Sequence, residues 1–130
     1  MPASTVLVET TILVDYLRQS AAAADYLDQT RVESNLLCSV VTKAKLIVGS
    51  RTRAEVRAIE QLLARFQMEP IQADDSIRAL TWLKKYFPTH GAGFHDCLLG
   101  AAAARLRIPI ETLNEKHFKV LPGVKVVRPY

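Results

Sequence analysis

The stretch TVLVETTILVDYLR, residues 5–18, decides the fold of this 130-residue chain. Residues 5–8 form a short apolar run rich in β-branched side chains, which is typical of a buried strand. Glu9 follows directly, and Thr10 or Thr11 can cap a helix whose apolar residues recur at helical spacing. A buried strand that leads through polar residues into an amphipathic helix predicts one unit of a parallel α/β sheet.

The same alternation of strand and helix patterns continues along the chain. We expect further extended segments at 36–39, 68–71, 108–112 and 125–127. We expect helices at 21–27, 42–49, 54–66, 74–88, 95–105 and 115–118, with Thr42 capping the second of these and Pro88 stopping the fourth. No linker, repeat or low-complexity segment interrupts the pattern. The sequence therefore predicts a single domain over residues 1–130, an α/β/α sandwich around a mainly parallel central sheet.

Composition places the chain among ordinary globular proteins. Hydrophobic residues make up 49% and charged residues 23%, and no apolar run is long enough to span a bilayer. The N-terminus shows no secretory signal pattern, so we expect a cytoplasmic protein without membrane contact. Cys38 and Cys97 both lie in apolar stretches and lack metal-ligand spacing, which favours reduced, buried core thiols.

The formal net charge is +4, and many of the basic side chains lie between Arg31 and Arg65. Two interpretations stay open for this segment. It is either the solvated face of two helices or a stripe that binds the backbone of RNA. In the second interpretation Lys43 and Arg51 are RNA-binding residues.

Polar residues that follow the predicted strands are the candidates for chemistry, because ligands of open α/β sheets bind at the carboxyl ends of the strands. Glu9 follows the first strand, and Thr112 and Asn114 follow a later one. Asp96 lies in the first turn of a helix, where it either faces that crevice or stabilises the helix N-terminus. The phosphate-loop, GxSxG and HExxH motifs are absent. The residues alone therefore indicate an α/β domain with an acidic crevice.

Four blocks, taken in order, resemble the VapC-type PIN domains. They are VLVETTILVDYLR (6–18), SVVTKAKLIVG (39–49), GFHDCLLGAAA (93–103) and IETLNEKHF (110–118), followed by the closing strand LPGVKVV (121–127). Each block is weak by itself, but together they cover nearly the whole chain at the spacing of that family.

The resemblance implies a PIN-like fold and a site in which three or four carboxylates hold Mg²⁺ or Mn²⁺ for cleavage of RNA. Glu9 stands at the first metal position, where Asp is usual, and Asp96 stands at the third. Lys45 replaces the family's Glu, and Asn114 and His117 occupy positions of which one usually carries Asp. We thus assign Glu9, Asp96, Asn114 and Lys45 to the catalytic site, with Glu9 and Asp96 as metal ligands.

Lys45 leaves two arrangements open. Its ammonium group can lie between Glu9 and Asp96 in place of the metal, since a cation 4 Å away would be repelled by about 4 kcal/mol at an effective dielectric constant of about 20. Alternatively, Lys45 turns toward solvent or an RNA phosphate and leaves room for one ion. Four further side chains are expected to support the carboxylates: Thr10, Thr112, Asp15 and His117.

The resemblance implies a VapC-like toxin of a type II toxin–antitoxin system, a Mg²⁺- or Mn²⁺-dependent endoribonuclease. Its activity would be weakened or lost through Lys45, Asn114 and His117. The alternative is a non-catalytic PIN-fold module that binds RNA or an antitoxin. The partners implied are a VapB-like antitoxin, RNA and a second copy of the chain in a homodimer.

Overall fold

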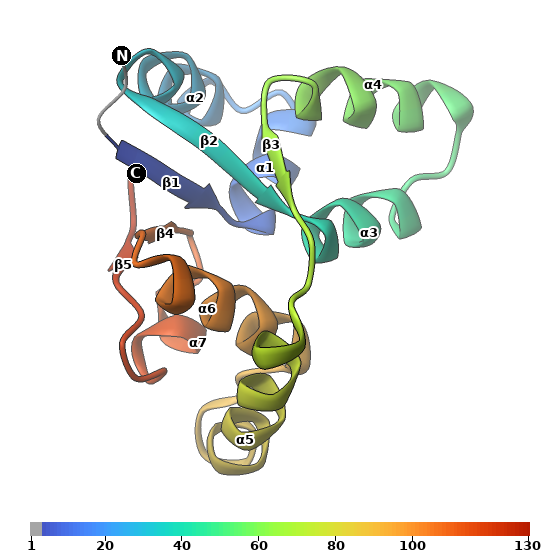
Figure 1. Ribbon diagram of the computed structural model, residues 1–130. Helices are drawn as coiled ribbons and strands as arrows, with labels where there is room; N and C mark the ends of the chain where they lie inside the picture. Colours follow the sequence, from blue (N-terminus) through green and yellow to red (C-terminus); the bar gives the residue numbers. More distant parts are fainter. Residues whose placement is uncertain (1–3) are drawn as a thin grey trace.

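The computed structural model describes residues 4–130, so residues 1–3 of the expected domain lie outside the described part. The described elements alternate as the sequence predicts (Figure 1). The strands are β1 (Ser4–Val8), β2 (Ser34–Ser39), β3 (Gln67–Glu69), β4 (Ile110–Glu111) and β5 (Val126–Val127). The helices are α1 (Thr10–Leu17), α2 (Ala21–Glu33), α3 (Val40–Val48), α4 (Arg53–Leu63), α5 (Ala73–His90), α6 (Phe94–Leu106) and α7 (Glu115–Lys119).

The five strands form one sheet in the order β3-β2-β1-β4-β5, and every pairing is parallel. The central strand β1 pairs with β2 on one side, Val6 opposite Leu36, and with β4 on the other, Leu7 opposite Ile110. All carboxyl ends therefore meet at one edge of the sheet, where Glu9 follows β1. The predicted α/β architecture is confirmed, and the sheet is wholly rather than mainly parallel.

Two apolar cores cover the two faces of the sheet. Successive side chains of a strand point to opposite faces. Val6 and Val8 accordingly pack with residues of α1, α2, α3 and α4, whereas Leu7 packs mainly with residues of α5, α6 and α7. Figure 1 shows the two helical layers, with α5, α6 and α7 in the lower half. This is the expected three-layer sandwich.

Helix α6 packs closely against its neighbours, which sets the position of Asp96 in its first turn. Ala101 and Ala103 are buried, as expected for a close-packing alanine run. A Cβ atom on Gly100 would lie 2.6 Å from Leu121 Cδ1 and 3.6 Å from the ring of Trp82. Small residues on this face let α6 approach α5 and the segment after α7.

Two predicted helix starts are wrong by a few residues. Glu9, rather than Thr10 or Thr11, is the N-cap of α1, and its carboxylate accepts a hydrogen bond from Thr11 N. Ser39, rather than Thr42, caps α3 in the same way through Val41 N. In both cases the last strand residue or the residue after it supplies the cap, so the helix begins with almost no intervening loop.

Several predicted element lengths also differ from those observed. Pro88 does not stop α5, which continues to His90 and ends at Gly91 with φ 72°. Pro88 is exposed in the last turn, where the carbonyl that loses its N–H partner can bind water. Helix α2 continues to Glu33 beyond its expected end, and β4 is only two residues long.

Both cysteines are free and buried, as predicted. Burial raises the pKa of the Cys38 thiol to about 12 and that of Cys97 to about 11, so both remain protonated at neutral pH. They are therefore core side chains rather than nucleophiles. Within residues 4–130, no helix is long and apolar enough to cross a membrane.

Candidate functional site

A groove with a volume of about 840 Å³ opens at the carboxyl end of β1. Helices α1, α3 and α4 contribute to its walls, together with the first turn of α6 and the residues around α7. Every residue assigned to the catalytic site from the sequence lines it: Glu9, Lys45, Asp96 and Asn114. His117, Asp15 and Thr10 lie in the same walls, whereas Thr112 supports the site from behind.

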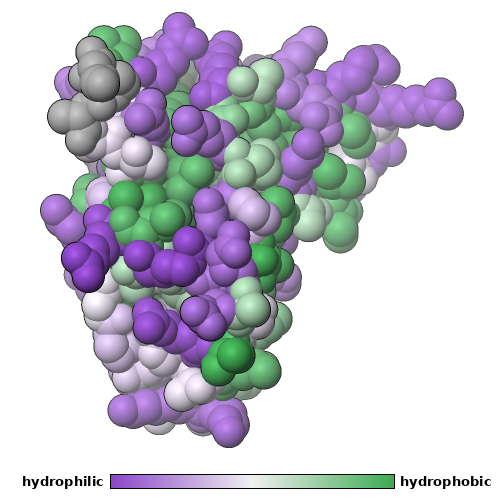
Figure 2. Space-filling view, in the orientation of Figure 1, coloured by the Kyte–Doolittle hydropathy of each residue, from purple (hydrophilic) through white to green (hydrophobic). Residues whose placement is uncertain are grey.

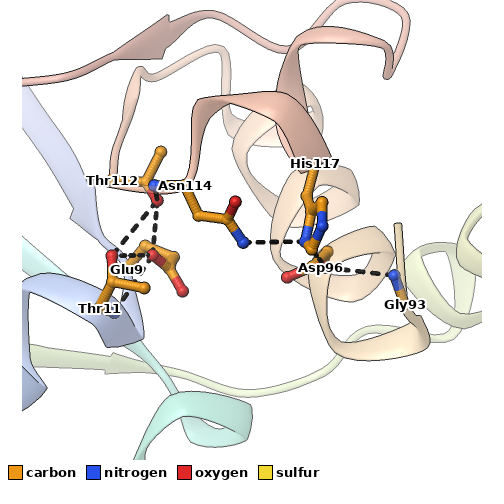
Figure 3. A network of polar contacts seen from close by, with 7 residues as sticks. All are labelled: Glu9, Thr11, Gly93, Asp96, Thr112, Asn114 and His117. Carbon is orange, nitrogen blue, oxygen red and sulfur yellow. Dashed lines mark hydrogen bonds and ion pairs between the residues drawn. The ribbon is translucent and has the colours of Figure 1, made fainter. Parts of the chain in front are cut away.

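Hydrogen bonds from two threonine residues, Thr11 and Thr112, hold the Glu9 carboxylate in place (Figure 3). Its Oε1 atom accepts from Thr11 N at 3.2 Å, from Thr11 Oγ1 at 2.6 Å, and from the hydroxyl of Thr112. Each hydroxyl in turn accepts from a backbone N–H of the loop after β4, from Leu113 N at 3.0 Å and from Asn114 N at 2.9 Å. Glu9 is only 3% exposed, so these donors replace the water that it loses.

The Asp96 carboxylate is held from the other side of the groove. Its Oδ2 atom accepts from Gly93 N at 3.1 Å, which caps α6, and lies 2.9 Å from His117 Nδ1. The side-chain amide of Asn114 lies 2.8 Å from the same ring nitrogen. A carboxylate can only accept, so Nδ1 carries the proton, and the Asn114 amide fits best with its oxygen turned toward the ring. His117 thus contacts the Asp96 carboxylate, in the supporting position expected from the sequence.

Each carboxylate keeps one oxygen outside these networks. No hydrogen bond among residues 4–130 uses Glu9 Oε2 or Asp96 Oδ1, and Figure 3 shows both carboxylates at the same gap. No three His, Cys, Asp or Glu side chains of the described chain are placed to share one ion. Two carboxylates do suit Mg²⁺ or Mn²⁺, because a hard cation that keeps several waters needs only one or two such ligands. The residues present therefore fit a hydrated divalent ion.

Lys45 does not bridge the two carboxylates. Its side chain is exposed on α3, lines the groove, and takes part in no ion pair within residues 4–130. The arrangement in which Lys45 replaces the metal between Glu9 and Asp96 is therefore wrong for this structure. Lys45 instead lines the groove with an exposed side chain, as in the alternative arrangement.

Two of the supporting residues have other partners than expected. Within residues 4–130 the Thr10 hydroxyl makes no hydrogen bond to the Glu9 carboxylate but shares a buried hydrogen bond of 3.0 Å with Thr42 on α3. Asp15 accepts from the Tyr130 hydroxyl at 3.1 Å. Burial and this hydrogen bond raise the pKa of Tyr130 to about 12. Asp15 thus borders the groove, tied to the C-terminal segment rather than to Glu9.

The two predicted RNA-binding residues lie outside the groove. Lys43 forms a 3.1 Å ion pair with Glu60 of α4, and Arg51 is exposed beside Ser50 at the groove margin. Arg53 and Arg57 are exposed on α4, where Figure 2 shows a largely hydrophilic surface at the upper right. Both interpretations of the basic segment are compatible with this exposed position.

Some residues of the groove carry no signal in the sequence. Thr11 is the second hydroxyl donor to Glu9, and its place three residues after the end of β1 was the available hint. The groove also has an apolar wall, formed by Val14, Leu17, Leu46, Ile59 and Leu113. These residues come from α1, α3, α4 and the loop after β4, so only the tertiary packing brings them together.

The fold and site define a class: a parallel α/β/α protein with an acidic groove where the central strand ends. The chain belongs to the PIN domain family, whose model matches residues 6–123. It is 36% identical over 121 residues to Ribonuclease VapC10 of Mycobacterium tuberculosis, covering 92% of this chain and 90% of the relative. The family resemblance seen in the four sequence blocks is thereby confirmed.

Solved structures show the same fold. A toxin–antitoxin complex from Klebsiella pneumoniae contains a chain with a TM-score of 0.78 and 24% identity, covering 96% of this chain and 98% of that one. The DNA-bound VapBC complex from Salmonella typhimurium gives a TM-score of 0.80 at 14% identity, covering 98% and 99%. At these identities the likeness concerns the fold.

Proposed function

We propose that this chain is a VapC-like toxin that cleaves RNA with the help of Mg²⁺ or Mn²⁺, as one component of a type II toxin–antitoxin system in the cytoplasm. One observation carries the proposal. Glu9 and Asp96 face one groove, each with one oxygen committed to the protein and one left for a ligand. The relative with 36% identity is itself named a ribonuclease.

A bound divalent ion would polarise the phosphate of the RNA and would lower the pKa of a water molecule bound to it. The chain's own residues prepare its ligands. The hydroxyls of Thr11 and Thr112 orient Glu9, and His117 orients Asp96. Because these donors are bound to a rigid strand end and a helix N-terminus, the two free oxygens hold their positions without substrate.

The alternative is a non-catalytic PIN-fold module that binds RNA or an antitoxin. It is favoured by Lys45, which stands where the family has Glu, and by Asn114 and His117, which occupy two positions of which one usually carries Asp. Cleavage of a structured RNA separates the two functions. Purified protein with Mn²⁺ or Mg²⁺ should cut the RNA, and EDTA should stop the reaction. Binding without cleavage at any concentration of either metal would establish the non-catalytic module.

The hydroxyl of Thr112 offers a test of how Glu9 is held. Thr112→Val removes the donor to Glu9 and leaves Asn114 N without its acceptor. We expect the free energy of unfolding to fall by about 1–3 kcal/mol and the Mn²⁺ affinity to fall about tenfold. Titration calorimetry and urea unfolding measure both effects.

The matched control is Thr42→Val, which removes a buried hydroxyl that bonds to Thr10 and not to Glu9. It should lower the free energy of unfolding about as much as Thr112→Val does. Its Mn²⁺ affinity should stay within about twofold of the wild type, because neither Glu9 nor Asp96 loses a hydrogen-bond donor. Equal loss of affinity in the two variants would mean that Thr112 acts through stability alone.

The antitoxin partner is proposed for the groove itself. Its apolar wall, beside Glu9 and Asp96, offers a surface on which an apolar segment can pack. The solved structures with this fold include toxin–antitoxin complexes. An antitoxin seated there would also cover the two carboxylates and block access of RNA.

A homodimer is proposed through α5, whose outer face carries the exposed apolar side chains of Ile77, Leu80 and Phe87. The double variant Ile77→Asp/Leu80→Asp should be monomeric in analytical ultracentrifugation, because burying two carboxylates opposes association. Val32→Asp, which changes an exposed apolar side chain on α2, serves as the control and should remain dimeric. A monomeric wild type would rule out this part of the proposal.

A further inference from the structure

Lys45 is a charged groove side chain for which residues 4–130 supply no ion-pair partner. We propose that Lys45 binds the RNA phosphate at the bond to be cut, so that the groove works with a single divalent cation. This inference rests on the proposed function, because it names how the same groove recognises its substrate.

The position of Lys45 is set by a buried contact one turn earlier on α3. Thr42 is bonded to Thr10, the residue directly after Glu9, and this fixes α3 against the first turn of α1. Residues three and four apart lie on one face of a helix. Lys45 therefore projects from the face that carries Thr42, and Gly49, one turn further, lines the same groove. Helix α3 packs against both α1, which Glu9 caps, and α6, which contains Asp96. Lys45 therefore lies on a helix that contacts both of these helices.

The charge of the groove matches one divalent ion. The side chains that line it include four carboxylates, from Glu9, Asp15, Glu55 and Asp96, and two cationic groups, from Arg18 and Lys45. With His117 neutral the formal charge is −2, which one Mg²⁺ or Mn²⁺ would cancel. A phosphate that then enters adds a negative charge to a neutral groove, and an ammonium group beside it stabilises that charge.

The nearby acids are engaged elsewhere, which leaves Lys45 for a ligand. Glu60 pairs with Lys43 at 3.1 Å, and Glu55 accepts from Arg51 N at 2.6 Å. Glu9 and Asp96 present their free oxygens to the cation site. An RNA phosphate held at that cation would lie beside the groove wall that Lys45 shares, within reach of its ammonium group. Because the proposed function is RNA cleavage, we take RNA rather than an acidic protein as the partner of Lys45.

RNA binding in Ca²⁺ in place of Mg²⁺ or Mn²⁺, with the RNA checked for intactness on a gel, tests the inference without any requirement for cleavage. A fluorescent single-stranded RNA is titrated with wild type, Lys45→Met, Lys45→Arg and, as the control, Lys84→Met, which removes an exposed lysine of α5. We expect Lys45→Met to weaken binding about threefold to tenfold and to lower the slope of log affinity against log salt by about 0.7. Lys45→Arg should retain the slope, and Lys84→Met should match the wild type.

Equal RNA affinity and salt slope in Lys45→Met and wild type would overturn the inference. So would a wild type that binds no RNA in Ca²⁺, or a Lys45→Met variant that loses binding of poly-L-glutamate as strongly as binding of RNA. Manganese stoichiometry is a second measure: one ion for the wild type and a second, weaker one for Lys45→Glu. If the wild type binds RNA through Lys45 but never cleaves it with Mn²⁺, the proposed nuclease activity fails while the phosphate contact stands.

Discussion

Asp96→Asn is expected to lower metal-dependent RNA cleavage by about 1,000-fold or more. The change removes one of two charged ligands, and loss of about 4 kcal/mol of transition-state stabilisation corresponds to that factor. The fold should persist, because an asparagine oxygen can still accept from Gly93 N at the start of α6. The variant should also lose the rise in melting temperature that Mn²⁺ gives the wild type.

The measurements are initial rates on a structured RNA and melting curves with and without Mn²⁺. Asp28→Asn is the matched control, since it neutralises an exposed acid of α2 outside the groove. It should retain the wild-type rate within about twofold. An Asp96→Asn variant that cleaves RNA at nearly the wild-type rate would show that the reaction uses other ligands.

Arg105→Met is expected to destabilise the fold by about 2–3 kcal/mol, below the full cost of breaking a buried ion pair because the Arg105 side chain is 29% exposed. Arg105 makes two hydrogen bonds to Asp75, of 2.8 and 2.9 Å, and one of 2.6 Å to Glu69. The side chain of Asp75 is only 3% exposed, so the substitution leaves a buried carboxylate without its cation. The same contacts hold the pKa of the Arg105 guanidinium above its usual range.

This cluster ties the end of β3 and the start of α5 to the last turn of α6, outside the groove. Urea unfolding measures the loss, and Arg57→Met is the control, because it removes an exposed arginine from α4 and should cost less than about 0.5 kcal/mol. A loss below about 1 kcal/mol for Arg105→Met would mean that water replaces the guanidinium at Asp75. In that case the double variant Arg105→Met/Asp75→Leu should be hardly more stable than Arg105→Met alone.

The sequence predicted the fold well where a strand is buried on both faces, as in β1 and β2, and where a helix is amphipathic, as in α4. The run around Val6, Leu7 and Val8 has that character, and the structure places it at the centre of the sheet. Element ends were predicted less well. Pro88 was expected to stop α5, yet the helix passes it, since a proline in an exposed last turn loses one hydrogen bond that water can replace.

The acids of the site were predictable from their place at strand and helix ends. For Asp96 both interpretations hold together, because one oxygen caps α6 at Gly93 N and the residue lines the groove. Thr11 was missed in favour of Thr10. With Glu9 as the N-cap, the residue two places on is the one that returns to the cap, and Thr10 faces α3 instead.

The direction of Lys45 could not be derived from its sequence position. Helical spacing places it on the groove face of α3, but a flexible side chain of four methylenes can reach either the two acids or the solvent. The Thr10–Thr42 contact sets how α3 meets α1, and within residues 4–130 Lys45 forms no ion pair with either acid. The apolar wall of the groove depends on packing in the same way.

The most direct test of the metal-dependent site is a crystal of the wild type grown with Mn²⁺ and measured for anomalous scattering. We expect one strong peak within about 2.0–2.4 Å of both Glu9 Oε2 and Asp96 Oδ1, with waters completing the shell. The peak should vanish in Asp96→Asn. No peak in the groove at saturating Mn²⁺, or a peak bound by neither carboxylate, would mean that Glu9 and Asp96 do not form a metal site.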